Sequence, residues 1–487
     1  MILPPDGEAT RGFTALLKQL NHVASAFRRK FSVAFLVALA SVCFEAPPQA
    51  QPPKPNILLI QADDLGYGDL SVYGQAMYQT PNIDRLARSG LRFISYYSGS
   101  TVCAPSRAAL MTGLHTGHTS IRGNLAGNTL RPDDRTIAML LKDGGYRTAM
   151  IGKWGLGESE SPGRPDRKGF DHYFGYLSQT HAHRQFTDHL YRDGQRVELK
   201  ENEYSNDLFT RDAMSVIEQS DNRPFFIYLN YTVPHAELRV PDDSIAPFRG
   251  RYPEKAFVNA AADTKLTGPD EPSLGYRSQP TPHAAFAGMV SRMDRDVGRI
   301  VDLLRARGLD QRTLVLFTSD NGPHQEGGAD PEFFKSSGGL HGIKRDMYEG
   351  GIRVPMIASW PGTIAAGTST TYAAAHWDLF PTFAALAGVA LPSGLDGTSI
   401  LPVLQGKPQA PHDFLYWEFH ERGFQQAVRM GNWKGVRLAK DKPLELYNLA
   451  DDPTEFTDVA AKHPDVVAKI ETYLKTARTE SANWPVK

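Results

Sequence analysis

The sequence predicts an α/β fold, with a large, mainly parallel sheet flanked by helices and a small C-terminal antiparallel sheet with one helix. Three observations lead to this prediction: short apolar runs of strand length, helical patterns between them, and a change of pattern near residue 410. The runs expected to form buried strands of the large sheet are Ile57 to Ile60, Thr148 to Ile151, Phe225 to Tyr231, Leu314 to Thr318 and Val354 to Ser359.

Two helices are expected between these strands, and each is closed by a glycine, which suits the left-handed position after a helix. They cover Ile83 to Ser89, before Gly90, and Met289 to Arg307, before Gly308. Alternation of apolar strands with helices is the pattern of a parallel sheet covered on its faces. We therefore expect a main domain over residues 51–410.

Beyond residue 410 the pattern changes to short strand-like runs separated by turns, followed by one helical segment. Such a pattern is typical of a small antiparallel sheet with a helix packed on it. We expect this α+β subdomain over residues 411–487. Its predicted elements are the strands Phe414 to Phe419, Gln426 to Met430, Trp433 to Leu438 and Leu444 to Leu449, and the helix Asp465 to Arg478.

Residues 1–50 have the features of a signal peptide rather than of a folded element. The basic residues Arg28 to Lys30 precede the apolar run Phe31 to Phe44, which is too short to span a bilayer comfortably. Cleavage after Ala50 predicts an exported protein, periplasmic or secreted, without stable membrane insertion. Lipidation of Cys43 is the less favoured alternative, because Val42 is a poor residue before a lipidated cysteine.

Charge and cysteine content narrow the class of protein further. The formal net charge is -1, which favours neither nucleic acid nor an anionic membrane as a partner. The chain has 2 cysteines, and removal of the leader leaves only Cys103, so no intramolecular disulfide can form. A lone cysteine is ordinarily a small buried hydrophobe, and only its neighbours can indicate another role.

Polar residues follow four of the predicted strands at the point where each strand ends. Because ligands bind outside the carboxyl ends of the strands in open α/β sheets, these side chains are expected to meet at one edge. A single polar residue in such a place is usually a turn former, but four chemically distinct sets are not explained in that way. The residues are Asp63 and Asp64, Lys153, His235, and Asp320 and Asn321.

The neighbours of Cys103 place it at a predicted helix start, because Pro105 suits the first turn of a helix. A helix N-terminus presents free N–H groups and the positive end of the helix dipole. Arg107 lies one helical turn further on, so its guanidinium can reach back toward Cys103. The segment is therefore suited to an anionic ester.

The segment around Cys103 and several flanking motifs resemble the formylglycine-dependent sulfatases, and the resemblance extends from about residue 54 to the C-terminus. The Cys-X-Pro-Ser-Arg and Leu-X-Thr-Gly pattern is the family's modification signature. The flanking motifs occur in the family's order. They are Asp63-Asp64-Leu65-Gly66-Tyr67-Gly68-Asp69, Gly152-Lys153-Trp154, Pro234-His235, Ser319-Asp320-Asn321-Gly322, and Lys344 before Tyr348-Glu349-Gly350-Gly351.

The resemblance implies an alkaline-phosphatase-like fold, with residues 51–410 as the catalytic sulfatase domain. It implies that a formylglycine-generating maturation enzyme oxidises Cys103 to 3-oxoalanine (formylglycine). One hydroxyl of the hydrated aldehyde attacks sulfur, and the other later expels sulfate by regenerating the aldehyde. Protonation of the leaving oxygen by His235, alone or with Lys344, is also implied, as is the binding of sulfate oxygens by Lys153 and Lys344.

The same edge is expected to bind a metal ion. Hydrolysis of a sulfate ester needs neutralisation of the equatorial oxygens as well as a nucleophile. Asp63, Asp64, Asp320 and Asn321 offer hard oxygen ligands, which together with the modified residue 103 and the ester could complete the coordination of Ca²⁺. Mg²⁺ is the less favoured ion.

One position departs from the family pattern, since many members have histidine where this chain has Gly155. Either His181 or His183 could supply the missing imidazole from another loop. Their alternating spacing would put both on one side of an extended segment. Substrate binding and plain packing are the alternative roles of these two histidines.

The leaving group is the least constrained part of the prediction. Export favours a sulfated carbohydrate over a small aryl sulfate, because a degrading enzyme must meet material too large to import. Phosphonate monoester or phosphodiester hydrolysis with the same nucleophile, and a catalytically silent sulfoglycan-binding protein, are the rival functions. Residues that could line a sugar or aryl pocket, or belong to the core, are Trp154, Tyr173, Phe174, Tyr176, His181 and Arg184.

Overall fold

The computed structural model describes residues 53–125, 127–263 and 275–486, so the predicted signal peptide lies outside the described residues. Residues 54–487 form one compact unit. Within the described ranges, no helix combines the length and the apolar character needed to cross a bilayer.

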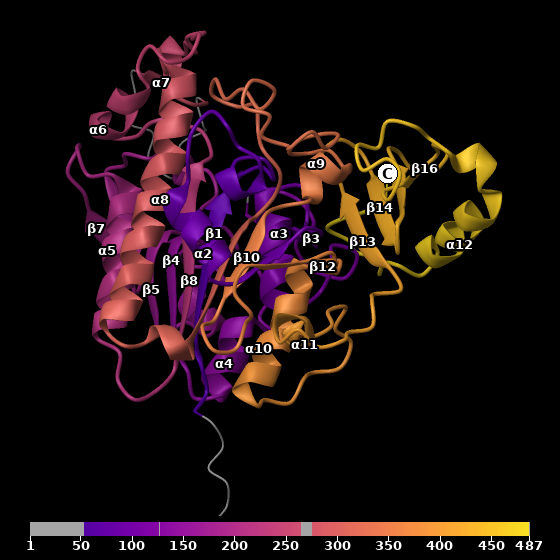
Figure 1. The fold of residues 1–487 in the computed structure, drawn as a ribbon, viewed down its shortest axis with the longest axis horizontal. Helices are drawn as coiled ribbons and strands as arrows, with labels where there is room; N and C mark the ends of the chain where they lie inside the picture. Colours follow the sequence, from indigo (N-terminus) through magenta and orange to yellow (C-terminus); the bar gives the residue numbers. More distant parts are fainter. Residues whose placement is uncertain (1–52, 126, 264–274, 487) are drawn as a thin grey trace, which may run out of the picture. The chain divides into compact units, whose positions relative to one another are not determined.

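The large sheet has ten strands in the order β11-β2-β10-β9-β1-β8-β4-β5-β6-β7, and Figure 1 shows it between two layers of helices. Its centre, from β9 to β5, is parallel, whereas β10, β6 and β7 run antiparallel to their neighbours. The predicted large, mainly parallel sheet is confirmed. The strands are β1 (Asn56–Asp63), β2 (Leu91–Phe93), β4 (Arg147–Lys153), β5 (His172–Tyr176), β6 (His189–Arg192), β7 (Gln195–Glu198), β8 (Phe225–Pro234), β9 (Thr313–Ser319), β10 (Met356–Ser359) and β11 (Thr368–Thr370).

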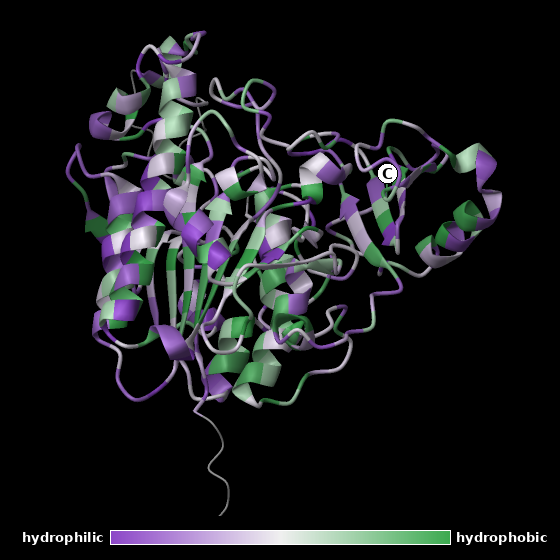
Figure 2. Ribbon diagram, viewed as in Figure 1, coloured by the Kyte–Doolittle hydropathy of each residue, from purple (hydrophilic) through white to green (hydrophobic). Residues whose placement is uncertain are grey.

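Helices cover both faces of this sheet, because successive residues of its central strands point to opposite sides. In β1, Leu58 and Ile60 pack with α5 and α8 in one core, whereas Ile57 and Leu59 pack with α3, α4 and α10 in the other. Figure 2 shows the resulting apolar strands between helices whose outer faces are hydrophilic. The helices are α2 (Pro81–Arg88), α3 (Cys103–Thr112), α4 (Ile137–Asp143), α5 (Ser205–Glu218), α6 (Asp242–Ile245), α7 (Ala260–Asp263), α8 (Pro282–Ala306), α9 (Glu349–Ile352), α10 (Leu379–Ala387) and α11 (Leu401–Leu404).

Some elements differ from the sequence-based expectation. The helix expected from Met289 starts at Pro282 in the structure, where the proline occupies its first turn. The two-residue strands β3 (Tyr96–Tyr97) and β12 (Ala374–Ala375) form a separate small sheet. The short 3-10 helices are η1 (Ser71–Tyr73), η2 (Pro165–Lys168), η3 (His181–His183), η4 (Ala246–Phe248), η5 (Asp310–Arg312), η6 (His376–Asp378) and η7 (Ala460–Lys462).

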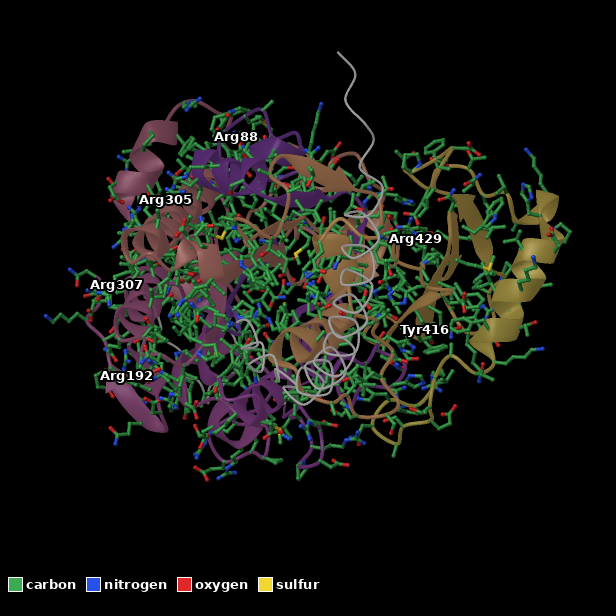
Figure 3. The ribbon with its side chains drawn as sticks, turned by 60° about the horizontal axis from the view of Figure 1, so that its bottom comes forward. Arg88, Arg192, Arg305, Arg307, Tyr416 and Arg429 are labelled. Atoms are coloured by element: carbon green, nitrogen blue, oxygen red, sulfur yellow. The ribbon has the colours of Figure 1, made fainter. Side chains whose placement is uncertain are left out.

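The C-terminal part forms the expected four-stranded antiparallel sheet with a helix on it. Alternate residues of its first strand face opposite sides: Trp417 packs toward Trp377 of the main domain, and Tyr416, labelled in Figure 3, packs toward Ile470 of the final helix. One face of this small sheet therefore packs against the main domain. Its elements are β13 (Leu415–Phe419), β14 (Gln425–Met430), β15 (Trp433–Arg437), β16 (Glu445–Asn448) and α12 (Pro464–Leu474).

Candidate active site

The carboxyl ends of the four central parallel strands bring the predicted polar residues to one edge. Asp63 ends β1, Lys153 ends β4, His235 follows β8, and Asp320 and Asn321 follow β9. These strands are hydrogen-bonded neighbours in the order β9-β1-β8-β4. All five residues are buried. The edge is therefore a polar site enclosed within the protein.

Cys103 faces this edge from the first turn of α3. Its Sγ lies 3.5 Å from Asp63 Oδ1 and 4.0 Å from Asp64 Oδ1. The Asn124 side chain accepts a hydrogen bond from Ala104 N at 2.9 Å and so caps the start of the helix. Burial raises the pKa of the Cys103 thiol well above its ordinary value. An unmodified thiol here stays protonated and is a poor nucleophile.

The acidic residues around Cys103 have the chemistry of a site for a hard cation. One ligand atom each from Asp63, Asp64, Cys103 and Asp320 lie within 4.8 Å of one another. Asn321 donates from Nδ2 to Asp64 Oδ1 at 2.6 Å, and its buried Oδ1 has no hydrogen-bond partner within the described ranges of the chain. Carboxylate and amide oxygens are the ligands that Ca²⁺ and Mg²⁺ take in proteins. These residues therefore fit a divalent cation.

The shifted pKa values of two of these carboxyl groups also favour a divalent cation at this site. Burial, and then the neighbouring charge of Asp63, raise the pKa of Asp320 to about 7. Burial also acts to raise the pKa of Asp63, but Lys153, His235 and Arg107 hold it well below its ordinary value. The negative charges of Asp63 and Asp320 repel each other at this distance, and a bound dication would relieve their repulsion.

Three cationic side chains pair with these carboxylates. Arg107 donates from Nη2 to Asp320 Oδ2 at 2.8 Å, and Lys153 Nζ donates to Asp63 Oδ2 at 2.8 Å. Lys344, from the loop between β9 and α9, donates from Nζ to Asp64 Oδ2 at 2.8 Å. All three cations are buried. Three carboxylates and three cations balance, so a bound dication makes the site net positive and suited to an anion.

His235 stands in a stack of three imidazoles. Its ring centroid is 4.6 Å from that of His183 and 5.3 Å from that of His324, with interplanar angles of 13° and 18°. Its Nε2 accepts from Lys344 Nζ at 3.0 Å, so the Nδ1 hydrogen is donated to the backbone oxygen of Ala236. Burial, and then the charge of Lys344, lower the pKa of His235 well below its ordinary value. The imidazole is therefore neutral and held in one tautomer.

The structure separates the two histidines that were expected to lie on one side of an extended segment. Residues 181–183 form the 3-10 helix η3, so the prediction of an extended segment is wrong. His183 joins the stack on His235, whereas His181 hydrogen-bonds through Nε2 to Thr187 Oγ1 at 2.8 Å and packs edge-on against Tyr176. The tighter winding of a 3-10 helix turns residues two apart to different sides. Of these two histidines, only His183 contacts His235.

The position of Gly155 explains its departure from the family pattern. Its φ is +72°, and a Cβ atom built there would lie 2.5 Å from the Nε2 atom of Gln179. The backbone conformation therefore favours glycine at residue 155, and a side chain there would require the end of the Gln179 side chain to shift. The Nε2 atom of Gln179 is buried and has no hydrogen-bond partner among the described residues. In this chain the Gln179 side chain fills the space beside Gly155.

The aromatic residues near the site belong to the core. Trp154, Tyr173, Phe174 and Tyr176 are buried and pack in the two cores that cover the large sheet. They are not available to stack on a sugar or aryl ring. Arg184 is also buried and pairs with Glu237 at 3.1 Å. The core alternative is therefore correct for these residues.

Sequence reasoning missed three residues that contact the site from loops. Glu326 Oε2 lies 3.5 Å from Lys344 Nζ, and Tyr276 donates to the same oxygen at 3.0 Å. His324 stacks on His235. His324 and Glu326 follow Asn321 by three and five residues, so a search extended a few residues beyond the end of β9 could have found them. Tyr276 comes from the β8–β9 connection and gives no comparable signal.

Comparisons with known proteins agree with this geometry. Residues 55–389 match the family model "Sulfatase", and residues 339–480 match the model "N-sulphoglucosamine sulphohydrolase, C-terminal". The chain is 31% identical to human arylsulfatase A over 507 residues, covering 90% of this chain and 89% of the relative. It is 32% identical to pig N-acetylgalactosamine-6-sulfatase over 401 residues, covering 75% and 69%. The crystal structure of Ps i-CgsB in complex with k-i-k-neocarrahexaose superposes with a TM-score of 0.74 at 29% identity, covering 89% of this chain and 95% of that one.

Proposed function

This chain belongs to the sulfatase family of the alkaline phosphatase superfamily, and on that premise we propose that it releases inorganic sulfate from a sulfated carbohydrate. We further propose that its nucleophile is formylglycine made from Cys103 and that its metal ion is Ca²⁺. One observation carries the proposal: the cysteine at the start of α3 faces three carboxylates and an unpartnered amide oxygen at the carboxyl edge of the sheet.

Different residues of the edge would bind the metal ion and the sulfate ester. Asp63, Asp64, Asp320 and Asn321 would hold Ca²⁺ together with residue 103. The hydrated aldehyde would supply a nucleophilic hydroxyl, and a bound cation would offset negative charge on the ester and on that hydroxyl. In the part of the chain that the structure describes, these ligands come from three segments that a buried sheet holds rigidly.

The cations orient the ester and respond to its changing charge. Lys153 pairs with Asp63 and Lys344 with Asp64, and both ammonium groups are placed to bind sulfate oxygens. Arg107 lies one turn after Cys103, and its guanidinium is fixed by Asp320 and by the backbone oxygen of Lys153 at 2.9 Å. Arg107 would hold the carboxylate of Asp320 in place beside the cation. Its guanidinium would also be close enough to contact the hydroxyl of the nucleophile.

The leaving oxygen is protonated by the pair formed by Lys344 and His235. As the S–O bond breaks, its electron pair stays on the departing oxygen, which takes a proton from the Lys344 ammonium. His235 accepts a hydrogen bond from that ammonium at 3.0 Å and so orients it. Enclosure of both groups excludes water, which strengthens these interactions.

A carbohydrate leaving group is supported by the relatives, two of which are named for or bound to sugars. Export through a signal peptide and conversion by a formylglycine-generating enzyme complete the proposal. Both would occur before the protein meets its substrate, because a folded site encloses residue 103.

The proposal is tested by expressing the mature chain with a formylglycine-generating enzyme and measuring the mass of the peptide containing residue 103. Sulfate release is then assayed on a panel of sulfated mono- and oligosaccharides, with Ca²⁺, with Mg²⁺ and after chelation. We expect the aldehyde or its hydrate, and sulfate release that Ca²⁺ restores best. A persistent thiol, beside a known sulfatase converted in the same host, would contradict the proposed nucleophile.

A further inference from the structure

The Lys344 ammonium has three N–H groups, and each has an acceptor in the structure. Two acceptors belong to the site already described, Asp64 Oδ2 at 2.8 Å and His235 Nε2 at 3.0 Å. The third is Glu326 Oε2 at 3.5 Å, which also lies 3.7 Å from His235 Nε2. Glu326 therefore touches both members of the proton-donating pair.

Glu326 is itself held firmly. Tyr276 donates to its Oε2 at 3.0 Å, and Arg345 donates from Nη1 to its Oε1 at 2.6 Å. The backbone N–H of Glu326 donates to His324 Nδ1 at 3.1 Å, and the His324 ring stacks on His235. The loop that carries Glu326 thus contacts the pair through a carboxylate and through a ring.

Exposure separates Glu326 from the buried groups it touches. The side chains of Lys344 and His235 are 2% and 1% exposed, whereas that of Glu326 is 20% exposed and that of Arg345 is 28% exposed. Glu326 therefore lies where the enclosed edge meets solvent. A carboxylate at this point fixes the ammonium without competing for the metal ligands.

We propose that Glu326 is a positioning residue for leaving-group protonation: with Tyr276 and Arg345 it holds the Lys344–His235 pair toward the departing oxygen. This inference rests on the proposed function, because it assigns Glu326 to a step of that reaction. Without the carboxylate, one ammonium hydrogen loses its acceptor and the Lys344 side chain gains freedom to turn away. The value of kcat should then fall most for substrates whose leaving oxygen needs a proton.

The experiment compares Glu326→Gln with wild type on two aryl sulfates of similar size. 4-Nitrophenyl sulfate releases a stable phenolate, whereas the oxygen leaving from phenyl sulfate is more basic and needs the proton. We expect kcat on phenyl sulfate to fall by about 10²-fold and kcat on 4-nitrophenyl sulfate by about threefold or less, with KM nearly unchanged on both. An equal loss on both substrates would overturn the inference.

Two further variants separate positioning from folding. Tyr276→Phe removes one hydrogen bond to Glu326, and we expect the same selective loss at about a tenth of the size. Glu421→Gln is the matched control, because Glu421 pairs with the other side of Arg345 at 3.4 Å and should change both substrates alike. If Glu326→Gln does not fold, a uniform loss in Tyr276→Phe overturns the inference. Wild type that releases sulfate from neither substrate nor from the sugar panel would instead contradict the proposed function.

Discussion

Two of the buried charge clusters in this molecule differ in kind, and only one of the two has the properties of a binding site. The seam cluster lies where the C-terminal sheet meets the main domain and is formed by Glu349, Lys434 and Glu455. Its Lys434 bridges Glu349 and Glu455 at 3.1 Å each, and Tyr97 donates to Glu349 at 2.7 Å. Every charge there has a protein partner.

At the catalytic edge the protein partners do not complete the set. The Asn321 amide oxygen is unpartnered, and Cys103 reaches the carboxylates at 3.5 and 4.0 Å. Glu349 belongs to a sulfatase motif just as Asp320 does, yet it joins two parts of the fold. Burial of charge and membership of a motif are therefore not enough to indicate chemistry, whereas an unsatisfied buried ligand atom facing several carboxylates is.

The largest expected effect is on the catalytic edge. Cys103→Ala should lower sulfate release by about 10³-fold or more, because it removes the proposed nucleophile. The free energy of unfolding should change by about 1 kcal/mol or less, since only one buried sulfur is lost. Kinetics and urea unfolding check both parts. Retained turnover in the purified variant would place the chemistry elsewhere.

The seam cluster should behave in the opposite way. Lys434→Met leaves the carboxylates of Glu349 and Glu455 buried without their shared cation, and we expect a loss of about 3–5 kcal/mol in unfolding free energy. Turnover per folded molecule should stay close to wild type. Lys440→Met, at an exposed position, is the control. A large fall in turnover with unchanged stability would contradict the prediction that the seam cluster has a structural role only.

The histidines of η3 offer a smaller test of the same distinction. His183→Ala removes the ring stacked on His235 and should lower kcat by about tenfold. His181→Ala removes a buried ring that packs on Tyr176, so it should lower unfolding free energy by about 1–3 kcal/mol and leave kcat per folded molecule unchanged. The reverse pattern, measured by the same kinetics and unfolding, would reassign the two residues.

A further prediction concerns the pH dependence of stability at the seam. Burial, and then Glu349, raise the pKa of Glu455 to about 7, above its unfolded value of 4.5, against the opposing charge of Lys434. Between pH 4.5 and about 7 the folded state then binds more protons than the unfolded state, so stability from this group falls as pH rises.

Glu349 has the opposite sign, and the two residues titrate as a pair. Burial acts to raise its pKa, but Lys434, Arg353 and Arg429 lower it to about 2, so its contribution is lost as pH falls from 4.5 toward 2. The seam should be most stable near pH 4.5. Urea midpoints of wild type and Glu455→Gln from pH 4.5 to 7.5 check this, and an equal slope in both would contradict it.

Sequence reasoning located the strand-end residues because parallel strands with buried runs end at one edge whatever the loops do. Asp63, Lys153, His235 and Asp320 lie together for that reason. The β6–β7 hairpin was missed although Asp193-Gly194 is a typical hairpin turn, because β7 is largely exposed and lacks an apolar pattern.

Loop residues were harder to predict for a physical reason. Tyr276 and Glu326 are 50 positions apart in the chain and meet through tertiary packing that no local periodicity encodes. The winding of η3 was likewise not visible in the spacing of His181 and His183, because alternate spacing fits an extended strand and a turn equally well. Site residues at the ends of strands can be predicted from the sequence, whereas site residues on loops can be identified only once the three-dimensional structure is known.

The Gly155–Gln179 contact shows what a change at residue 155 would involve. A side chain there would have its first carbon 2.5 Å from the Nε2 atom of Gln179, so the end of the Gln179 side chain would have to turn away. The left-handed backbone, with a φ of +72°, adds a cost for residues other than glycine. The energetic effect of a histidine introduced at residue 155 should therefore depend on the residue at 179, because the two positions are in contact.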